Sequence, residues 1–227
     1  MTLTESAISP AASFRPFHEI NSGFSVFNKG SLYSFIAEPQ LIYRRAFSSG
    51  TFETLLGSAF ERSMRRTNAL LGTGYDNDAA LRDKQAAADL NLLHFEKIDY
   101  RYAGVFARLH YNARGRYLAH LTGRRDGSSR FAPGKQFGNF GAIGAAWIFS
   151  ETKAVRELAP LLSFGKIRVS YGNSGNDQIG DYQYQNTFLI SPYFYNGVQG
   201  AIPSRLANPD FQWEINKKWE AAIETAV

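Results

Sequence analysis

The chain has 227 residues, of which 15% are aromatic, and its mean hydropathy is −0.29. Its longest apolar run, GAIGAAWIF, is far shorter than the roughly 20 apolar residues of a transmembrane helix, which excludes such a helix. It has no cysteine, which excludes a disulfide framework and a Cys-ligated zinc site. Its net charge of +5 results from 25 basic and 20 acidic residues with no long basic run, so nucleic acid is not an expected partner.

The first part of the chain changes pattern near residue 31. Residues 1–30 are rich in Ser, Pro, Asn and Gly and predict an irregular approach segment or an extracellular loop. From Leu32 apolar and polar residues alternate, which predicts a strand over 32–45, with Pro39 marking an edge or a bulge. A second strand is expected over 51–63.

A long connection follows, over about 63–99. Its alanine-rich stretch, 79–93, predicts a short helix within an extracellular loop. Residues 150–162 predict a polar, partly helical connection. Five further strands are expected, over 101–112, 117–124, 138–149, 164–173 and 213–224.

The connections differ in length according to the end of the strands at which they fall. Short turns at 46–50 and 112–115 alternate with long loops at 63–99, 125–137 and 173–210, and the connection at 150–163 is the exception because it falls at the short-turn end but is not short. Short periplasmic turns opposite long extracellular loops are typical of outer-membrane barrels. The pattern predicts an all-β fold: an antiparallel up-and-down transmembrane β-barrel segment, about seven strands of a larger barrel.

The polar positions of the predicted strands are candidate lumen or substrate contacts. A charge on the lipid side costs about 2–4 kcal/mol near the membrane midplane, so we expect these side chains to face the lumen. There they bind one another, a plug or the substrate. They are Arg108, His110, His120, Arg124, Lys166, Arg168, Glu214, Lys218 and Glu220.

Three tryptophans, Trp147, Trp213 and Trp219, are predicted to lie at the membrane interface, where aromatic girdles form. Lys217 falls among the apolar positions of its strand. It is therefore expected near an interface, where its ammonium group reaches water.

Several stretches resemble one family. RRDGSSRFAPGKQFGNFGAIGAAWIFSE, KIRVSYGNSGNDQIGDYQY and LANPDFQWEINKKWEAAIE stand in the same order as in the SusC/RagA family of TonB-linked outer-membrane transporters, and AEPQLIYRRAF fits its upstream pattern. The resemblance covers roughly residues 20–227.

The resemblance implies a barrel of roughly 22 strands around a plug, in the outer membrane of a Gram-negative, Bacteroidota-like bacterium. It also implies energy from TonB and a SusD-like surface lipoprotein that serves as a lid over glycan, oligosaccharide or peptide substrates. Residues 31–227 are then expected to be a partial barrel from which the plug, the signal peptide and the C-terminal strands are absent. The sequence does not name the substrate.

The loop that carries the strongest resemblance has two interpretations. As a structural loop it fixes the strand register, with a tight turn at Asp-Gly and Asp126 paired with Arg125 or Arg130. As a functional loop it contacts substrate, lipopolysaccharide or the lid. Its residues are Arg125, Asp126, Gly127, Ser128, Ser129, Arg130 and Phe131.

Aromatic residues are dense between 182 and 195. They stack on sugar rings in one interpretation, and pack within the loop or against the lid in the other. They are Tyr182, Tyr184, Phe188, Tyr193, Phe194 and Tyr195.

No pattern in the sequence predicts catalysis, a metal site or a cofactor. The histidines His18, His94, His110 and His120 lack ligand spacing, and Ser and His do not form a nucleophile elbow. Asp76 and Asp78 lack the Gly and the distal Glu of a calcium loop. The alternative to a transporter wall is a soluble carbohydrate-binding β-domain that uses its exposed aromatic residues.

Overall fold

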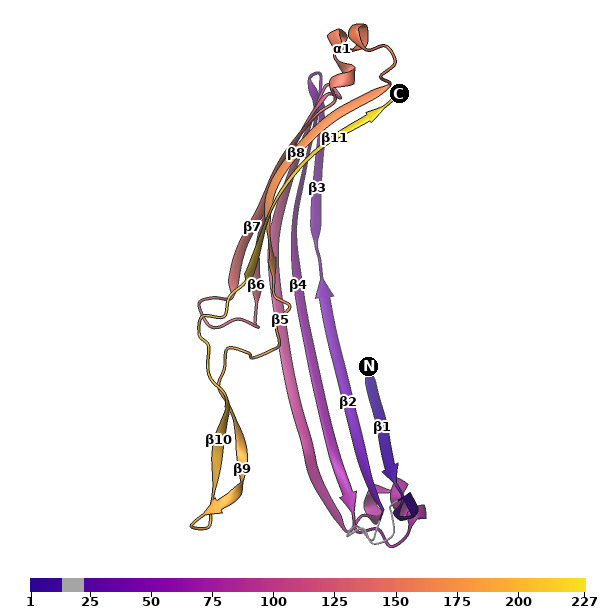
Figure 1. Ribbon diagram of the computed structural model, residues 1–227, viewed down its shortest axis with the longest axis vertical. Helices are drawn as coiled ribbons and strands as arrows, with labels where there is room; N and C mark the ends of the chain where they lie inside the picture. The colour runs from indigo at the N-terminus through magenta and orange to yellow at the C-terminus, as the bar shows by residue number, and fades with distance from the viewer. Residues whose placement is uncertain (14–22) are drawn as a thin grey trace. The chain divides into compact units, whose positions relative to one another are not determined.

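A computed structural model of the chain describes residues 1–13 and 23–227. The described residues form two compact units, Met1–Phe35 with Arg62–Tyr100 and Ile36–Glu61 with Arg101–Val227. Nearly all regular structure is antiparallel β-sheet, which confirms the predicted fold class (Figure 1). No helix of the described residues has the length and apolar character needed to cross a membrane.

Nine strands of the described residues form one sheet, in the order β1-β2-β4-β5-β6-β7-β8-β11 with β3 also paired to β4. Their bounds are β1 Thr2–Ser9, β2 Phe24–Ala37, β3 Gln40–Phe47, β4 Gly50–Thr73, β5 Asp89–Ala113, β6 Tyr117–Ser128, β7 Phe137–Trp147, β8 Phe164–Asn176 and β11 Glu214–Ala226. The expected number of about seven strands is therefore too low. Pro39 lies in the gap between β2 and β3, as its missing N–H predicts.

The first unit corrects two expectations. Residues 1–30 are not irregular where they are described, because β1 pairs with the start of β2 from Thr2↔Ser31 to Ser9↔Phe24; residues 14–22 lie outside the described residues. The loop expected over 63–99 is mostly strand, since β4 has 24 residues and β5 has 25. Polar side chains interrupt the alternation of apolar and polar residues on these strands. Some of them form ion pairs, such as Arg62 with Asp99 at 3.0 Å.

The helix predicted over 79–93 is wrong. Two 3-10 helices, Asp78–Arg82 and Lys84–Ala86, occupy its first part, and β5 begins at Asp89. Asn77 and Asp83 accept bonds from backbone N–H groups at the two helix starts, which favours separate short turns over one continuous helix. The single described α-helix, α1 (Lys153–Leu158), lies in the connection where partial helix is expected.

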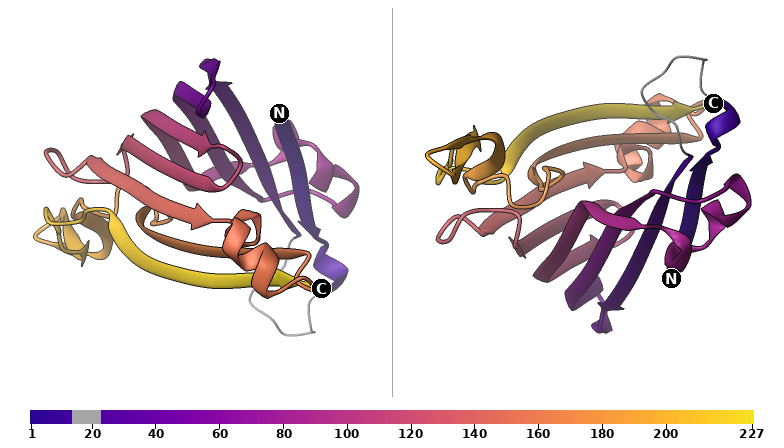
Figure 2. Two further views of the ribbon diagram at one scale, coloured as in Figure 1. Left: turned by 90° about the horizontal axis from the view of Figure 1, so that it is seen from above. Right: turned by 90° about the horizontal axis from the view of Figure 1, so that it is seen from below.

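In the second unit β5, β6, β7, β8 and β11 form a continuous set of neighbours, called the wall below. Its pairings show no register shift, and β8 and β11 run side by side in both views along the wall (Figure 2). Segments 114–116 and 148–163 join the strands at one end, and segments 129–136 and 177–213 join them at the other. The predicted ends are therefore right, but the sorting by length is not strict, because 148–163 is longer than 129–136.

A separate hairpin of β9 (Thr187–Tyr195) and β10 (Val198–Arg205) lies within the loop expected over 173–210. Its turn has positive φ at both Asn196 and Gly197, 49° and 77°, as a two-residue hairpin turn requires. The long loop thus contains regular structure that the sequence analysis did not predict.

Candidate functional site

The wall has two chemically different faces. Residues paired directly across antiparallel strands lie on the same face, and residues two apart share that face. One paired row consists of His110, His120, Gly144, Ser170 and Glu220. All nine predicted lumen residues have this parity, so they lie together on what we call the charged face.

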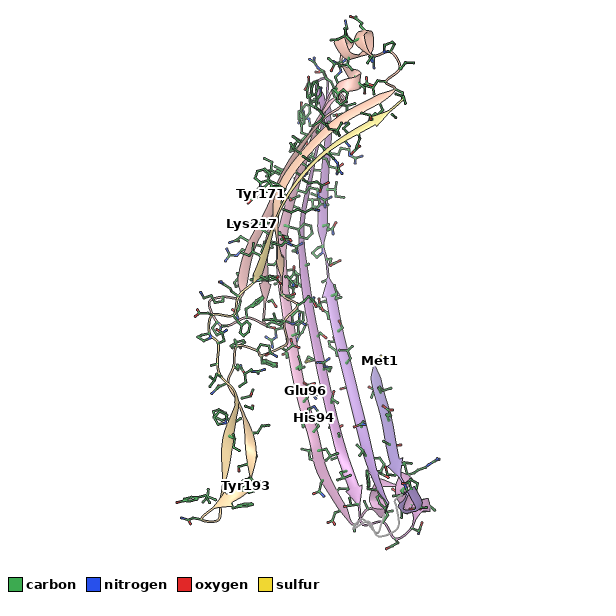
Figure 3. All side chains as sticks on the ribbon, viewed as in Figure 1. Met1, His94, Glu96, Tyr171, Tyr193 and Lys217 are labelled. Atoms are coloured by element: carbon green, nitrogen blue, oxygen red, sulfur yellow. The ribbon has the colours of Figure 1, made fainter. Side chains whose placement is uncertain are left out.

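The opposite, apolar face is built by the alternate residues. One paired row on it consists of Leu109, Leu121, Ile143, Tyr171 and Trp219. Large side chains on this face, such as those of Ile143 and Val169, are more than half exposed. Trp147 and Trp219 lie on this face by register, and Lys217 lies near Tyr171 as Figure 3 shows. An exposed apolar face of this extent needs a nonaqueous environment or a partner.

Charged residues of β8 and β11 form what we call the ion ladder. Arg168 contacts Glu220 and Glu224 at 3.0 Å each, which places one guanidinium between two carboxylates. Lys166 extends the ladder to Glu224 at 3.3 Å, and Lys218 to Glu220 at 3.7 Å. Four of the predicted lumen residues thus bind one another or Glu224, which the sequence analysis did not select. Glu214 lies apart and accepts a hydrogen bond from the Asn176 side chain.

The motif loop is built differently from the prediction. Arg125, Asp126, Gly127 and Ser128 belong to β6, so the Asp-Gly pair is not a turn. Asp126, only 5% exposed, accepts from Arg124 Nε at 2.6 Å and from Tyr102 Oη at 2.8 Å. Its partner is therefore neither Arg125 nor Arg130. The reason is strand geometry: Arg124 and Asp126 share a face, whereas Arg125 points to the other face, towards the Phe137 ring.

The second half of the motif ties the wall to the loop after β8. Arg130 donates to the Asp177 carbonyl at 3.0 Å and to Asp181 Oδ1 at 3.1 Å. Ser129 exchanges backbone and side-chain hydrogen bonds with Arg101, both at 2.9 Å. These contacts are internal and support the structural interpretation of the motif.

The motif ends in an aromatic cluster, the aromatic junction, formed by Phe131, Phe140 and Trp213 with Tyr102 and Ile179 packed against it. Phe131 is fully buried, and its ring centroid lies 5.0 Å from that of Trp213. Trp213 is only 8% exposed and donates its indole N–H to the Gln136 carbonyl at 2.9 Å. The prediction of an interface aromatic is wrong for Trp213, because its ring fills a protein core.

A hollow of about 480 Å³ opens on the charged face beside the aromatic junction. Arg108, Arg124, Asp126 and Asp177 supply charge to its lining, and Phe106, Phe140 and Trp213 supply aromatic surface. Arg124 is held by Asp126 and Tyr102, whereas the described residues offer Arg108 no hydrogen-bond or ion-pair partner. The hollow therefore presents one uncompensated guanidinium beside aromatic rings.

The small residues of β7 leave room for large neighbours on the same face. A Cβ at Gly144 would meet the His120 imidazole, which lies across that glycine. Directly opposite on β5 is His110. His18 lies outside the described residues. Within the described ranges, no group of three or more His, Cys, Asp or Glu side chains could hold a metal ion.

The aromatic residues predicted as one loop occupy two places. Tyr182 and Tyr184 are half-buried before the hairpin, and Asn208 donates to the Tyr184 carbonyl at 3.0 Å. Phe188 lies on β9, and Tyr193, Phe194 and Tyr195 are strongly exposed at the hairpin tip, where Figure 3 shows Tyr193. The two groups cannot be treated as one stacking surface.

Sequence reasoning missed Tyr102, Phe140, Asp177 and Asp181. The parity of β5 and β7 could have placed Tyr102 and Phe140 on the charged face, since Tyr102 has the parity of Arg108 and Phe140 that of Ala142. Asp177 and Asp181 contact Arg130 across about 50 residues of chain, and no local pattern predicts such a contact.

An antiparallel wall with one apolar and one charged face has the arrangement of a membrane-barrel wall. The TonB dependent receptor-like β-barrel family matches residues 9–226, and the chain belongs to this family. It is a family of receptors and not of enzymes.

Among individual relatives, the TonB-dependent receptor P39 of Formosa agariphila is 31% identical over 200 residues, which cover 87% of this chain and 19% of that protein. The TonB-dependent receptor SusC of Bacteroides thetaiotaomicron is 28% identical over 195 residues, 80% of this chain and 18% of that protein. The chain spans about a fifth of the length of these relatives.

A similar fold occurs in the RagAB peptide transporter, with a TM-score of 0.84, 20% identity, and coverage of 99% of this chain and 25% of that one. The RagAB peptide importer in its "open-open" state gives a TM-score of 0.80. The resemblance to the SusC/RagA family is thereby confirmed.

Proposed function

We propose that this chain is part of the wall of a TonB-dependent importer in the outer membrane of a Gram-negative, Bacteroidota-like bacterium. The importer takes up glycans, oligosaccharides or peptides and works with a SusD-like surface lipoprotein as its lid. Family membership, relatives named SusC and P39, and the fold shared with the RagAB peptide transporter support the proposal.

The observation that carries the proposal is the separation of the two faces. Every charged side chain predicted for the lumen lies on one face, while the other face exposes Leu121, Ile143, Val169 and Ile223. In a membrane barrel the apolar face contacts lipid and the charged face lines the lumen, so both find a suitable environment.

In this arrangement the hollow beside the aromatic junction faces the lumen. Its free Arg108 and its aromatic lining fit a substrate that offers both a carboxylate and an apolar or ring surface. Arg108 and the aromatic lining are equally suited to bind a plug domain. The uptake measurement below distinguishes substrate binding from plug binding.

The location is tested by fractionating cells that produce the full-length protein. We expect it in the outer-membrane fraction, with migration in detergent gels that changes on heating. Recovery in the soluble fraction would contradict the proposal and would return the soluble carbohydrate-binding domain to consideration. That alternative is not favoured, since the chain belongs to a receptor-barrel family and exposes a whole apolar face.

The import function is tested by deleting the gene and measuring growth on single glycans and on peptides. We expect loss of growth on one substrate class and co-purification of the intact protein with a surface lipoprotein. Arg108→Ala should then lower uptake while leaving the amount of folded protein unchanged. Arg114→Ala, at an exposed arginine of the β5–β6 turn, is the matched control and should not change uptake.

A further inference from the structure

The connection between β7 and β8 begins on the apolar face of the wall. Gly165 has the parity of Ile167 and Val169, so a side chain at this position would point to the apolar face. A Cβ built there would meet the Phe149 ring, which therefore lies on that face. Phe149 also packs edge-on against Trp147, with ring centroids 6.0 Å apart.

This contact occurs at the end of the wall that carries the 114–116 turn. Ile148 N–H donates to the Arg116 carbonyl at 2.8 Å, beside the β5–β6 turn. Ser163 N–H donates to the Ala226 carbonyl at 2.9 Å, at the end of β11. In Figure 1 α1 lies beyond the ends of β8 and β11. The segment therefore lies at the end that the proposed function assigns to the periplasm.

The segment from Lys153 to Leu162, KAVRELAPLL, divides into a charged first half and an apolar second half. Arg156 is paired with Glu151, and Lys153 is exposed. Leu158 and Leu161 are 85% and 83% exposed, and only Ala159 and Pro160 lie between them. Water is an unfavourable environment for two leucines held outward in so short a segment.

We propose that Lys153–Leu162 is an interfacial anchor that lies in the phospholipid head-group layer of the periplasmic leaflet, with Leu158 and Leu161 inserted among the acyl chains. The proposal rests on the proposed function, because it takes the apolar face to be the lipid face. It adds a membrane contact made by a connection and not by a spanning strand.

Lipid is the occupant that the position of the segment favours. A paired row on the apolar face, Tyr117, Trp147, Ile167 and Ile223, marks the last apolar level of the wall before the turns. Phe149 continues this row into the connection, so the anchor is continuous with the surface that faces lipid. Amphipathic segments with Lys or Arg beside Leu are typical of such interfaces.

The test uses the full-length protein reconstituted in vesicles of phosphatidylethanolamine and phosphatidylglycerol. This chain has no cysteine, so Leu161→Cys, Val169→Cys and Lys135→Cys each provide one labelling site once cysteines elsewhere in the protein are replaced by serine. Each site carries an NBD fluorophore. Lipids with a doxyl quencher near the head group or near the chain end report its depth.

We expect the probe at Leu161 to be quenched about threefold more by the shallow than by the deep quencher, as an interfacial position requires. The probe at Val169, in the middle of the apolar face, should be quenched more by the deep quencher. The probe at Lys135, in the β6–β7 connection at the opposite end of the wall, should resist both.

Quenching at Val169 without quenching at Leu161 overturns the anchor and leaves the proposed function standing. Lack of quenching at Val169 overturns the proposed function and the anchor with it. Equal quenching at Leu161 and Lys135 also overturns the anchor, since it shows no preference for the segment.

A second variant tests the chemistry of the contact. Leu158→Glu in the Leu161→Cys background should abolish the shallow quenching, whereas Leu158→Phe should retain it. Leu206→Glu changes an equally exposed leucine outside the segment and should leave the quenching unchanged. Heat-modifiable migration of every variant shows that the barrel has folded, so persistent quenching in folded Leu158→Glu overturns the proposed contact.

Discussion

The aromatic junction and the ion ladder lie on the same face of the wall but differ in their relation to water. In the junction Phe131 is fully buried, and Asp126, which accepts a hydrogen bond from Tyr102 of the junction, is nearly so. In the ladder, the side chains of Arg168 and Glu220 remain 48% and 38% exposed. A buried group that loses its partner has no water to replace it, whereas an exposed ion pair exchanges readily with solvent. The comparison indicates that the motif acts mainly by holding the loops on the wall.

The largest expected effect is at Phe131. Phe131→Ala should lower the free energy of unfolding by about 4 kcal/mol, because it removes a fully buried ring and leaves a cavity beside Trp213. The measurement is urea unfolding of the full-length protein in detergent. Phe137→Ala removes an exposed ring from neighbouring β7 and is the control, with an expected loss below about 1 kcal/mol. Similar losses for the two variants would mean that the junction is not a core.

Asp126 tests the polar contacts beside the junction. Asp126→Ala leaves Arg124 and the Tyr102 hydroxyl without their acceptor, at a cost of about 2–3 kcal/mol, since water reaches the half-exposed Arg124 and compensates in part. Asp126→Asn keeps one acceptor and should lose less. Unfolding in urea compares the two variants, and an unchanged midpoint for Asp126→Ala would contradict the assigned network.

A smaller effect is expected in the middle of the charged face. Gly144→Ala places a methyl group against the His120 imidazole and should cost about 1–2 kcal/mol. His120→Ala should remove most of this penalty in the double variant, which a double-mutant cycle measures as coupling. Additive effects would show that the imidazole does not lie over Gly144.

The smallest effect is expected in the ion ladder. Arg168→Gln should cost less than about 1 kcal/mol, because all of its ion pairs are exposed. The difference from the unaltered protein should shrink further when unfolding is repeated at high salt. A loss as large as that of Asp126→Ala would remove the contrast between the two regions.

The two-residue period of a strand explains which features the sequence could predict. It placed Arg108, His120, Lys166 and Glu220 on one face, because every wall pairing keeps register. The same rule could have paired Asp126 with Arg124 in place of Arg125. The ends at which the connections fall followed from the same strands, although their lengths did not sort strictly, and the family followed from three ordered motifs.

The remaining features depend on contacts between distant parts of the chain. Trp213 is of a residue type that is common at membrane interfaces, but Phe131 and Phe140, more than 70 residues earlier in the chain, enclose it. β1 lacks an apolar pattern and is a strand because β2 supplies its hydrogen bonds. The 3-10 turns near residue 80 arise because Asn77 and Asp83 bind backbone N–H groups in place of a continuing helix.

The pairing order of the wall has a consequence for its assembly. β5, β6 and β7 each pair with the next strand in the chain, so these pairings join residues that are close in sequence. β11 pairs with β8 only after the whole segment 177–213, including a hairpin, has been placed. Because the entropic cost of closing a loop rises with its length and distant pairings form slowly, β11 should join last. The open hydrogen-bonding edge of β8 is then the part of the nascent wall that needs protection longest.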